Sequence, residues 1–222
     1  MDTTITLAPH ALLEVGAFVT RFASPLAGLA TPEAISALLD PGARPRLGSS
    51  DEVRAAVRDL LRQGGFRPSG RSKPASEYLL AAHAEARFPR INAAVDACNV
   101  ASLFSGLPIS LVDLDRVAGR LHLGVAPAGT TYVFNPSGQV IDAGGLLCLA
   151  DPEGPTGTPV KDAQRTKTHD GTRTTLAIVW GARALPDRTA QATAWYRELV
   201  SQIPGAVLED VILVAAIAQG SA

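Results

Sequence analysis

The pattern of hydrophobic and polar positions is clearest between residues 88 and 115, where it predicts a helix followed by a strand. Apolar or small side chains recur there at spacings of three and four residues, which places them on one helical face. They are Ile91, Val95, Cys98, Ser102 and Leu103. Asn92 is the predicted N-cap and Gly106 the predicted end of the helix. Pro108 prevents the helix from resuming, and the alternation from Ile109 to Asp115 predicts a strand.

The same reading extends along the rest of the chain. Further strands are predicted over 3–7, 120–125, 130–134, 146–150, 174–180 and 207–215. Further helices are predicted over 31–40, 49–63, 75–86 and 187–203. The strands at 120–125 and 130–134 are expected to pair around Pro127-Ala128-Gly129, and residues 12–22 fit a strand or a helix equally well. We find no internal repeat and no interdomain linker, so residues 1–222 are expected to form a single domain.

Composition narrows the class of protein. With 222 residues, 46% of them hydrophobic and 18% charged, the chain is typical of a globular protein that buries its own core. Cys98 and Cys148 lie far apart in apolar runs, which favours a reduced, cytoplasmic setting. The N-terminus does not have the pattern of a signal peptide, and the longest apolar run is too short to span a membrane, so no membrane partner is expected.

The formal net charge of −1 provides no general attraction for nucleic acid, so any RNA contact requires a local basic patch. One candidate is the segment 66–73, which we call the basic loop and which carries Arg67, Arg71 and Lys73. Loop guanidinium groups are suited to phosphate contacts. The alternative is an ordinary solvated loop before the next helix.

Four motifs in the first segment, taken in order, resemble the tRNA-binding, editing domain of the phenylalanyl-tRNA synthetase β chain. They are Asp96-Ala97-Cys98-Asn99, Gly106-Leu107-Pro108, the strand after it, and Asp113-Leu114-Asp115. The chain looks still more similar to free-standing bacterial proteins built from that domain alone, over about residues 66–181. The resemblance implies an α+β fold with a mixed, mainly antiparallel sheet packed by helices, and the predicted order of elements permits it.

By this resemblance, a pocket for the aminoacyl end of a wrongly charged tRNA would be lined by Cys98, Asn99, Pro108 and Ser110. The synthetase members carry a histidine where this chain has Ser110, and serine is a poor base unless it is activated. Asn99 has an alternative role as a buried amide that ties the helix to a strand. Asp96 could instead hold a turn or pair with Arg90 or Arg116.

The second candidate segment, 161–168, matches a basic, hydroxyl-rich segment of the free-standing relatives. Its charged and hydroxyl side chains belong to Lys161, Asp162, Arg165, Thr166 and Lys167. They could hold the terminal phosphates of a tRNA acceptor end or the carboxylate of a small ligand. The alternative is a solvated loop in which Asp162 pairs with Arg165.

Together these features predict an aminoacyl-tRNA-binding protein that hydrolyses mischarged tRNA. The alternative is a non-catalytic module that binds a tRNA end or a small amino-acid-like ligand, and a third possibility is a partner-binding domain. No cofactor, metal site or DNA partner is expected, because no phosphate-binding or nucleophile motif and no ligand-spaced His or Cys is present. The parts of a synthetase that charge tRNA are missing, and the oligomeric state is left open.

Overall fold

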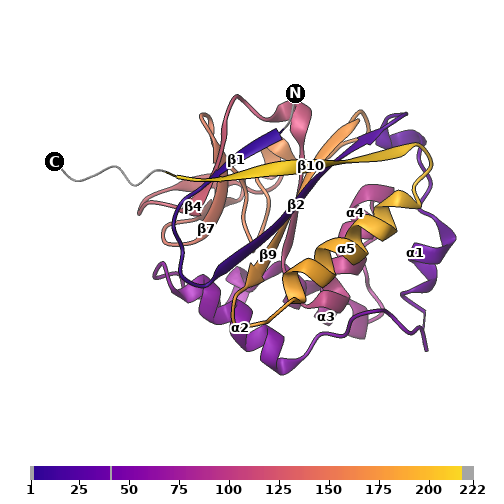
Figure 1. The fold of residues 1–222 in the computed structure, drawn as a ribbon, viewed down its shortest axis with the longest axis horizontal. Coiled ribbons are helices and arrows are strands. Elements are labelled where there is room, and N and C mark those ends of the chain that lie inside the picture. Colours follow the sequence, from indigo (N-terminus) through magenta and orange to yellow (C-terminus); the bar gives the residue numbers. More distant parts are fainter. Residues whose placement is uncertain (1–2, 41, 217–222) are drawn as a thin grey trace.

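The computed structural model describes residues 3–40 and 42–216, without the Arg71 side chain, as a mixed α+β structure (Figure 1). One large sheet has the strand order β3-β9-β2-β10-β1-β4-β7-β8, and β5 and β6 form a separate pair. The strands are β1 Thr3–Leu7, β2 Leu13–Phe22, β3 Ile109–Asp113, β4 Leu121–Val125, β5 Thr131–Val133, β6 Val140–Asp142, β7 Leu147–Asp151, β8 Gly154–Gly157, β9 Thr174–Ala182 and β10 Ala206–Ala215. The helices are α1 Glu33–Ala37, α2 Asp51–Arg62, α3 Ala75–Ala84, α4 Ala93–Ser105 and α5 Arg188–Ser201.

The sheet is mainly antiparallel, as predicted. Only β1 pairs in parallel among the described strands, with β10 on one side and β4 on the other. The first and last strands therefore pair with each other in the middle of the sheet, because β1 and β10 lie between β2 and β4. The segment 66–181, which carries the family resemblance, supplies the outer strands on both sides of this centre.

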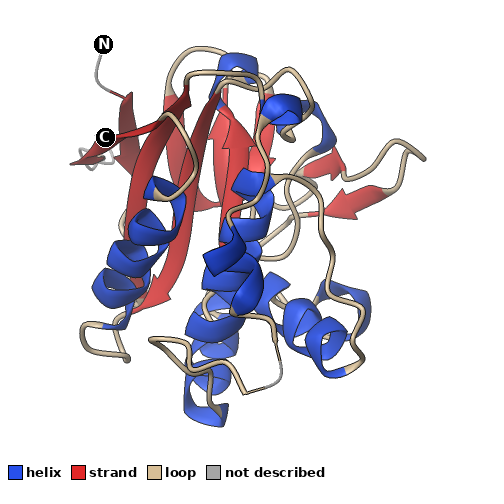
Figure 2. Ribbon diagram, turned by 90° about the vertical axis from the view of Figure 1, so that its right-hand side faces the viewer, coloured by secondary structure: helices blue, strands red, loops and turns tan. Residues whose placement is uncertain are grey.

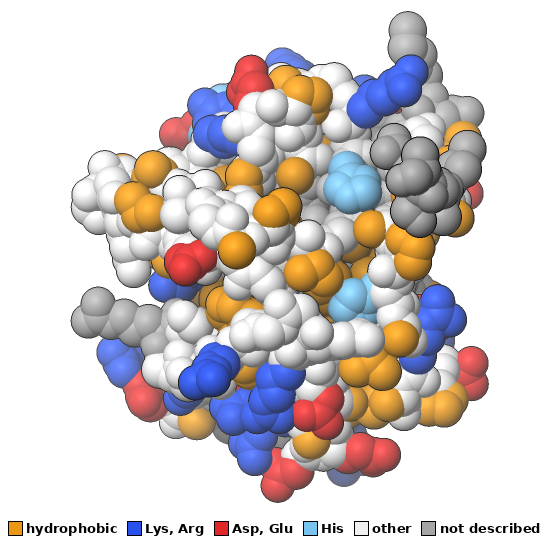
Figure 3. All heavy atoms as spheres, turned by 90° about the vertical axis from the view of Figure 1, so that its left-hand side faces the viewer, with side chains coloured by type: hydrophobic (Ala, Val, Ile, Leu, Met, Phe, Trp, Pro, Cys, Tyr) orange, Lys and Arg blue, Asp and Glu red, His pale blue; other side chains and the backbone are white. Residues whose placement is uncertain are grey.

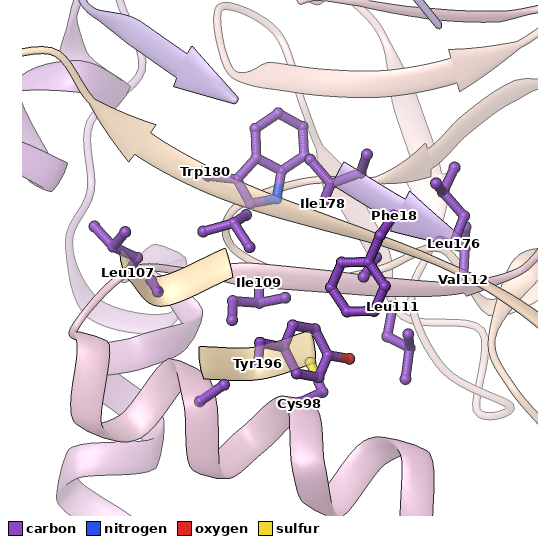
Figure 4. Packing of buried hydrophobic residues seen from close by; sticks show 14 of the residues in the cluster. Phe18, Cys98, Leu107, Ile109, Leu111, Val112, Leu176, Ile178, Trp180 and Tyr196 are labelled. Atoms are coloured by element: carbon purple, nitrogen blue, oxygen red, sulfur yellow. The ribbon is translucent and has the colours of Figure 1, made fainter. Parts of the chain in front are cut away.

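Helices α4 and α5 pack against the part of the sheet formed by β2, β3, β9 and β10 (Figure 2). The interface is apolar, and Figure 4 shows Phe18, Leu111, Cys98 and Tyr196 meeting in it. Gly16 and Gly181 permit this close approach, because a Cβ atom at either position would collide with a threonine hydroxyl of α5. Glycine in these two strands is thus a packing requirement of the helix above them.

The local signals around α4 are confirmed. The Asn92 side chain accepts a hydrogen bond from the Val95 amide at 3.0 Å, and Gly106 ends the helix with a φ of 72°, in the left-handed region. A Cβ at Gly106 would also lie 2.8 Å from a methyl group of Val53 in α2, so space and backbone both require glycine. The strand that follows Pro108 ends at Asp113, whose carboxylate accepts from the Asp115 amide.

One prediction of strand pairing is wrong, and the structure decides one choice that the sequence leaves open. The pairing of 120–125 with 130–134 is wrong, because β4 pairs with β1 and β7 while β5 pairs with β6. The intervening Pro127-Ala128-Gly129 turn connects different sheets instead of forming a hairpin. Residues 12–22, for which strand and helix were both open, contain the strand β2, and β10 and β9 flank it on either side. Within the described residues, no helix has the length and apolar character needed to cross a membrane.

Candidate functional site

Two ammonium groups of the segment 161–168 meet at one aromatic ring. The Lys167 Nζ lies 3.8 Å from the centroid of the Phe134 ring and donates a hydrogen bond to the Phe134 carbonyl at 2.6 Å. The Lys161 Nζ lies 4.4 Å from the same centroid. Burial and the neighbouring Lys161 charge lower the pKa of Lys167, while Asp162 acts in the opposite direction. Two like charges therefore lie close to the same ring, and this arrangement favours the binding of an anion between or beside them.

Asp162 lies beside this pair with its carboxylate turned into the protein. Its Oδ2 accepts a hydrogen bond from the Leu111 amide at 3.1 Å, whereas its buried Oδ1 has no well-formed partner among the described residues. Burial raises the pKa of Asp162 to about 6, although Ser110, Leu111 and Lys167 all favour the charged form. A Cβ at Gly157 would lie 2.9 Å from Oδ1, so a side chain there would crowd the carboxylate. The result is a carboxyl group that titrates near neutral pH.

Ser110 supports this carboxylate from inside the core. It has no solvent-exposed surface, its hydroxyl donates to the Thr158 carbonyl at 3.1 Å, and it accepts from the Trp180 indole at 2.9 Å. A Cβ at Gly157 would also lie 3.1 Å from this hydroxyl, which places Ser110 and Asp162 around the same glycine. In this conformation Ser110 acts on a ligand only through Asp162 and the backbone that it fixes.

A second hydrogen-bonded group fixes the backbone of Lys161. The Tyr132 hydroxyl donates to the Lys161 carbonyl at 2.6 Å, and Thr158 receives the Lys161 amide at 3.1 Å. Burial raises the pKa of Tyr132 well above its usual value, so the phenol remains a donor at neutral pH. Tyr132, Phe134 and Thr158 are absent from the residues predicted from sequence. The strand pattern of 130–134 marks Tyr132 as inward-facing, but it gives no indication that the strand meets residues 158–167.

Arg165 and Thr166 have structural partners. The Arg165 guanidinium binds the buried Asp151 carboxylate at 2.5 and 3.0 Å and the Gly154 carbonyl at 2.7 Å. The alternative pairing of Asp162 with Arg165 is therefore wrong. The buried Thr166 hydroxyl donates to the Thr156 carbonyl at 2.9 Å. Both residues brace the turn from which Lys161 and Lys167 extend.

The residues predicted on the helix side lie in the core or on α4. Cys98 lies in the core beside Tyr196, where burial raises the pKa of its thiol to about 12 (Figure 4). Pro108 is buried, and its carbonyl accepts the Trp180 amide at 3.0 Å. Asn99 is half-buried on α4, and among the described residues its side chain has no hydrogen-bond partner. Asp96 pairs with Arg90 at 2.9 Å, which confirms that alternative role.

The basic loop and the lysine pair adjoin each other through Tyr78. The Tyr78 hydroxyl donates to the Gly70 carbonyl at 3.3 Å, and its ring centroid lies 5.9 Å from the Lys161 Nζ. The Ala75 amide, just after the basic loop, donates to the Pro159 carbonyl, just before the segment 161–168, at 2.9 Å. Two candidate segments that are about ninety residues apart in sequence therefore share one surface.

Within the basic loop, Arg67 lines a hollow of about 570 Å³ together with Arg62 and Phe66. Lys73 is exposed, and the Arg71 side chain lies outside the part of the chain that the structure describes. Figure 3 shows Lys and Arg side chains gathered over the lower part of one face, although the net charge of the whole chain is −1. Within the described residues, no cluster of His, Cys, Asp and Glu suited to a metal ion is present.

Comparison with known proteins supports the fold. No protein-family model and no curated protein matches the sequence. Among solved structures, the chain is similar to an N-terminal fragment of the phenylalanyl-tRNA synthetase β-subunit from Pyrococcus horikoshii, with a TM-score of 0.55 and 9% sequence identity. The match covers 97% of this chain and 52% of that fragment, so the chain spans about half its length. At this identity the likeness shows a shared fold.

Proposed function

We propose that this protein binds the aminoacylated end of a tRNA at the surface formed by the lysine pair and the basic loop. The observation that carries the proposal is the meeting of Lys161 and Lys167 beside the buried Asp162, next to a loop that adds Arg67 and Lys73. Ammonium and guanidinium groups bind phosphates, and the half-exposed Tyr78 ring between the two segments offers a stacking surface for a base. The fold shared with a synthetase fragment supports the same choice of ligand.

We further propose that the bound ester is hydrolysed when the amino acid is the wrong one. In this step a water attacks the ester carbonyl, Asp162 accepts the water proton through Oδ2, and Asp162 then returns that proton to the terminal oxygen of the tRNA as it leaves. Lys161 and Lys167 stabilise the developing oxyanion. A carboxyl group with a pKa of about 6 is suited to this task, because it is mostly ionised at neutral pH and more basic than an ordinary carboxylate. Arg165 is not assigned this role, since Asp151 occupies its guanidinium.

A specific observation favours a second candidate function, a binding module without hydrolysis. The Asp162 Oδ1 and the Ser110 hydroxyl are both enclosed, and Ser110 replaces the histidine of the synthetase members. In that case the carboxylate would only shape the site and set its charge.

A deacylation assay with a panel of mischarged tRNAs tests both candidates. For a hydrolase we expect Asp162→Asn to lower turnover by about 100-fold or more, the usual scale for losing a general base, while tRNA binding is retained. Lys167→Met should weaken binding itself, and Arg44→Ala, an exposed arginine outside these segments, is the charge control. Binding without turnover in the wild type would select the module, and the absence of both would refute the proposed function.

A further inference from the structure

A separate hollow lies where β1 and β10 end and β2 begins. Its volume is about 430 Å³, within the range of roughly 300–1,000 Å³ typical of small-molecule pockets. Most of its wall is apolar and is contributed by Leu7, Ala8, Pro9, Leu13, Val15, Leu213 and Ala215. Three polar residues complete it, namely His10, Glu14 and Arg183. We call it the His10 hollow, and it shares no lining residue with the lysine pair or the basic loop.

The imidazole of His10 supplies a directed donor. Its Nδ1 accepts the Leu13 amide at 3.1 Å, so in the neutral ring the proton resides on Nε2. That Nε2 is buried and has no acceptor among the described residues. A buried donor without a partner is costly, and an oxygen placed against this edge of the ring would satisfy it.

The other two polar residues of the hollow carry opposite charges. Arg183 is exposed and Glu14 is half-buried, and within the described residues neither forms an ion pair or a side-chain hydrogen bond. They are held next to each other by the sheet, since Glu14 pairs with Gly181 and the Arg183 amide donates to the Leu12 carbonyl at 2.8 Å. One cation and one anion thus lie at the same apolar space, and the His10 ring lines it beside them.

We infer that the His10 hollow is a binding site for a small zwitterion with an aliphatic body, such as a free aliphatic α-amino acid. Its carboxylate meets Arg183 and the His10 Nε2–H, its ammonium group meets Glu14, and its aliphatic side chain lies against Leu7, Leu13 and Leu213. A simple fatty acid would leave Glu14 facing a like charge, and a simple amine would leave Arg183 and His10 without an acceptor. The charge pattern therefore selects a ligand that carries both groups.

Isothermal titration calorimetry of the full chain with three probes tests this inference. The probes are L-leucine, 4-methylpentanoate, which lacks the ammonium group, and 3-methylbutylamine, which lacks the carboxylate. We expect saturable binding of L-leucine and at least about tenfold weaker binding of each of the other two. Arg183→Ala should weaken the binding of L-leucine by a similar factor. L-leucine should then bind this variant no more tightly than 3-methylbutylamine does. L-leucine should bind the Glu14→Gln variant no more tightly than 4-methylpentanoate does.

Matched controls use charges outside the hollow. Arg44→Ala and Glu52→Gln should both leave the L-leucine affinity unchanged. The inference is overturned if L-leucine gives no saturable heat at millimolar concentration, if 4-methylpentanoate binds as tightly as L-leucine, or if the control variants weaken binding as much as Arg183→Ala.

Discussion

Asp162 costs the fold stability at neutral pH, because burial disfavours its charged form more than its neighbours favour it. Its folded-state pKa of about 6 exceeds the reference value of 3.8. The folded state therefore binds the proton more tightly than the unfolded state. The resulting contribution to stability is complete below about pH 4 and is lost as the pH rises through 6.

This linkage gives the first prediction. Asp162→Asn keeps the shape and removes the buried charge, so it should raise the free energy of unfolding by on the order of 2 kcal/mol at pH 8 and have little effect at pH 4. Urea unfolding at both pH values measures the difference. Asp115→Asn, at an exposed carboxylate, is the control. Equal pH dependence in both variants would contradict the assigned environment. A more stable but inactive Asp162→Asn would indicate that the buried charge is retained for function.

Ser110 provides the second prediction at this scale. Its hydroxyl satisfies the buried Trp180 indole and the Thr158 carbonyl. Ser110→Ala should therefore reduce the free energy of unfolding by about 1–3 kcal/mol, the cost of leaving buried partners unsatisfied. Ser137→Ala, at an exposed turn, should change it by less than about 0.5 kcal/mol. A loss of tRNA deacylation in Ser110→Ala with unchanged unfolding would contradict the structural role and favour direct contact with a ligand.

At the scale of elements, the turn after β8 depends on one partly buried ion pair. Arg165 is 29% exposed and Asp151 is fully buried. Burial would raise the pKa of Asp151, but hydrogen bonds from Arg165 and the Ala118 amide outweigh it and the net shift is downward. This contribution to stability is present above the usual carboxylate pKa and is lost as the pH falls below it.

Removing the Arg165 guanidinium should therefore lower the stability of the turn, since Arg165 has no assigned part in hydrolysis. We expect Arg165→Ala to cost about 3 kcal/mol in the free energy of unfolding at pH 7, because the Asp151 charge is left buried and unpaired. Arg46→Ala is a matched control, since its pair with Glu198 is more than half exposed and should be worth no more than about 1 kcal/mol. Chemical denaturation compares them. Similar small losses in both would show that the Asp151 pair is not needed for the turn.

The elements also show where sequence reasoning succeeds. Asn92, Gly106 and Pro108 act on their immediate neighbours, so the start and end of α4 and the start of β3 can be read directly from them. The partner of β4 cannot be read in this way. The same residues 121–125 would fit beside β5, and the pairing with β1 joins residues more than a hundred positions apart, such as Ile5 and Leu121. Likewise, the sequence shows that Asp162 is charged, but only packing against Leu111 and Gly157 reveals its burial.

At the scale of the whole molecule, a net charge of −1 conceals an uneven distribution. The sheet brings residues 158–167 against the start of α3, so Tyr78 joins the lysine pair to the basic loop. A local surface can thus attract phosphate although the chain as a whole does not. The sequence predicts the basic loop and the segment 161–168 as two separate patches. Only the fold, which the sequence patterns do not specify, brings them together as one surface.

This joined surface gives the last prediction, which concerns the salt dependence of tRNA binding. Each phosphate neutralised on a single strand contributes about −0.7 to the slope of log K against log salt concentration. If the basic loop contacts the acceptor end, the double variant Arg67→Ala/Lys73→Ala should reduce the magnitude of that slope by roughly 1.4. Filter binding between low and physiological salt measures it.

The control for this experiment must change the net charge equally. Arg44→Ala/Arg183→Ala takes the formal charge from −1 to −3, as the loop variant does, but at positions outside the joined surface. It should leave the slope unchanged, because counterion release depends on cations that touch phosphate and not on total charge. Equal reductions in both variants would show diffuse attraction. An unchanged slope in the loop variant, with Lys167→Met still weakening binding, would restrict the contact to the lysine pair.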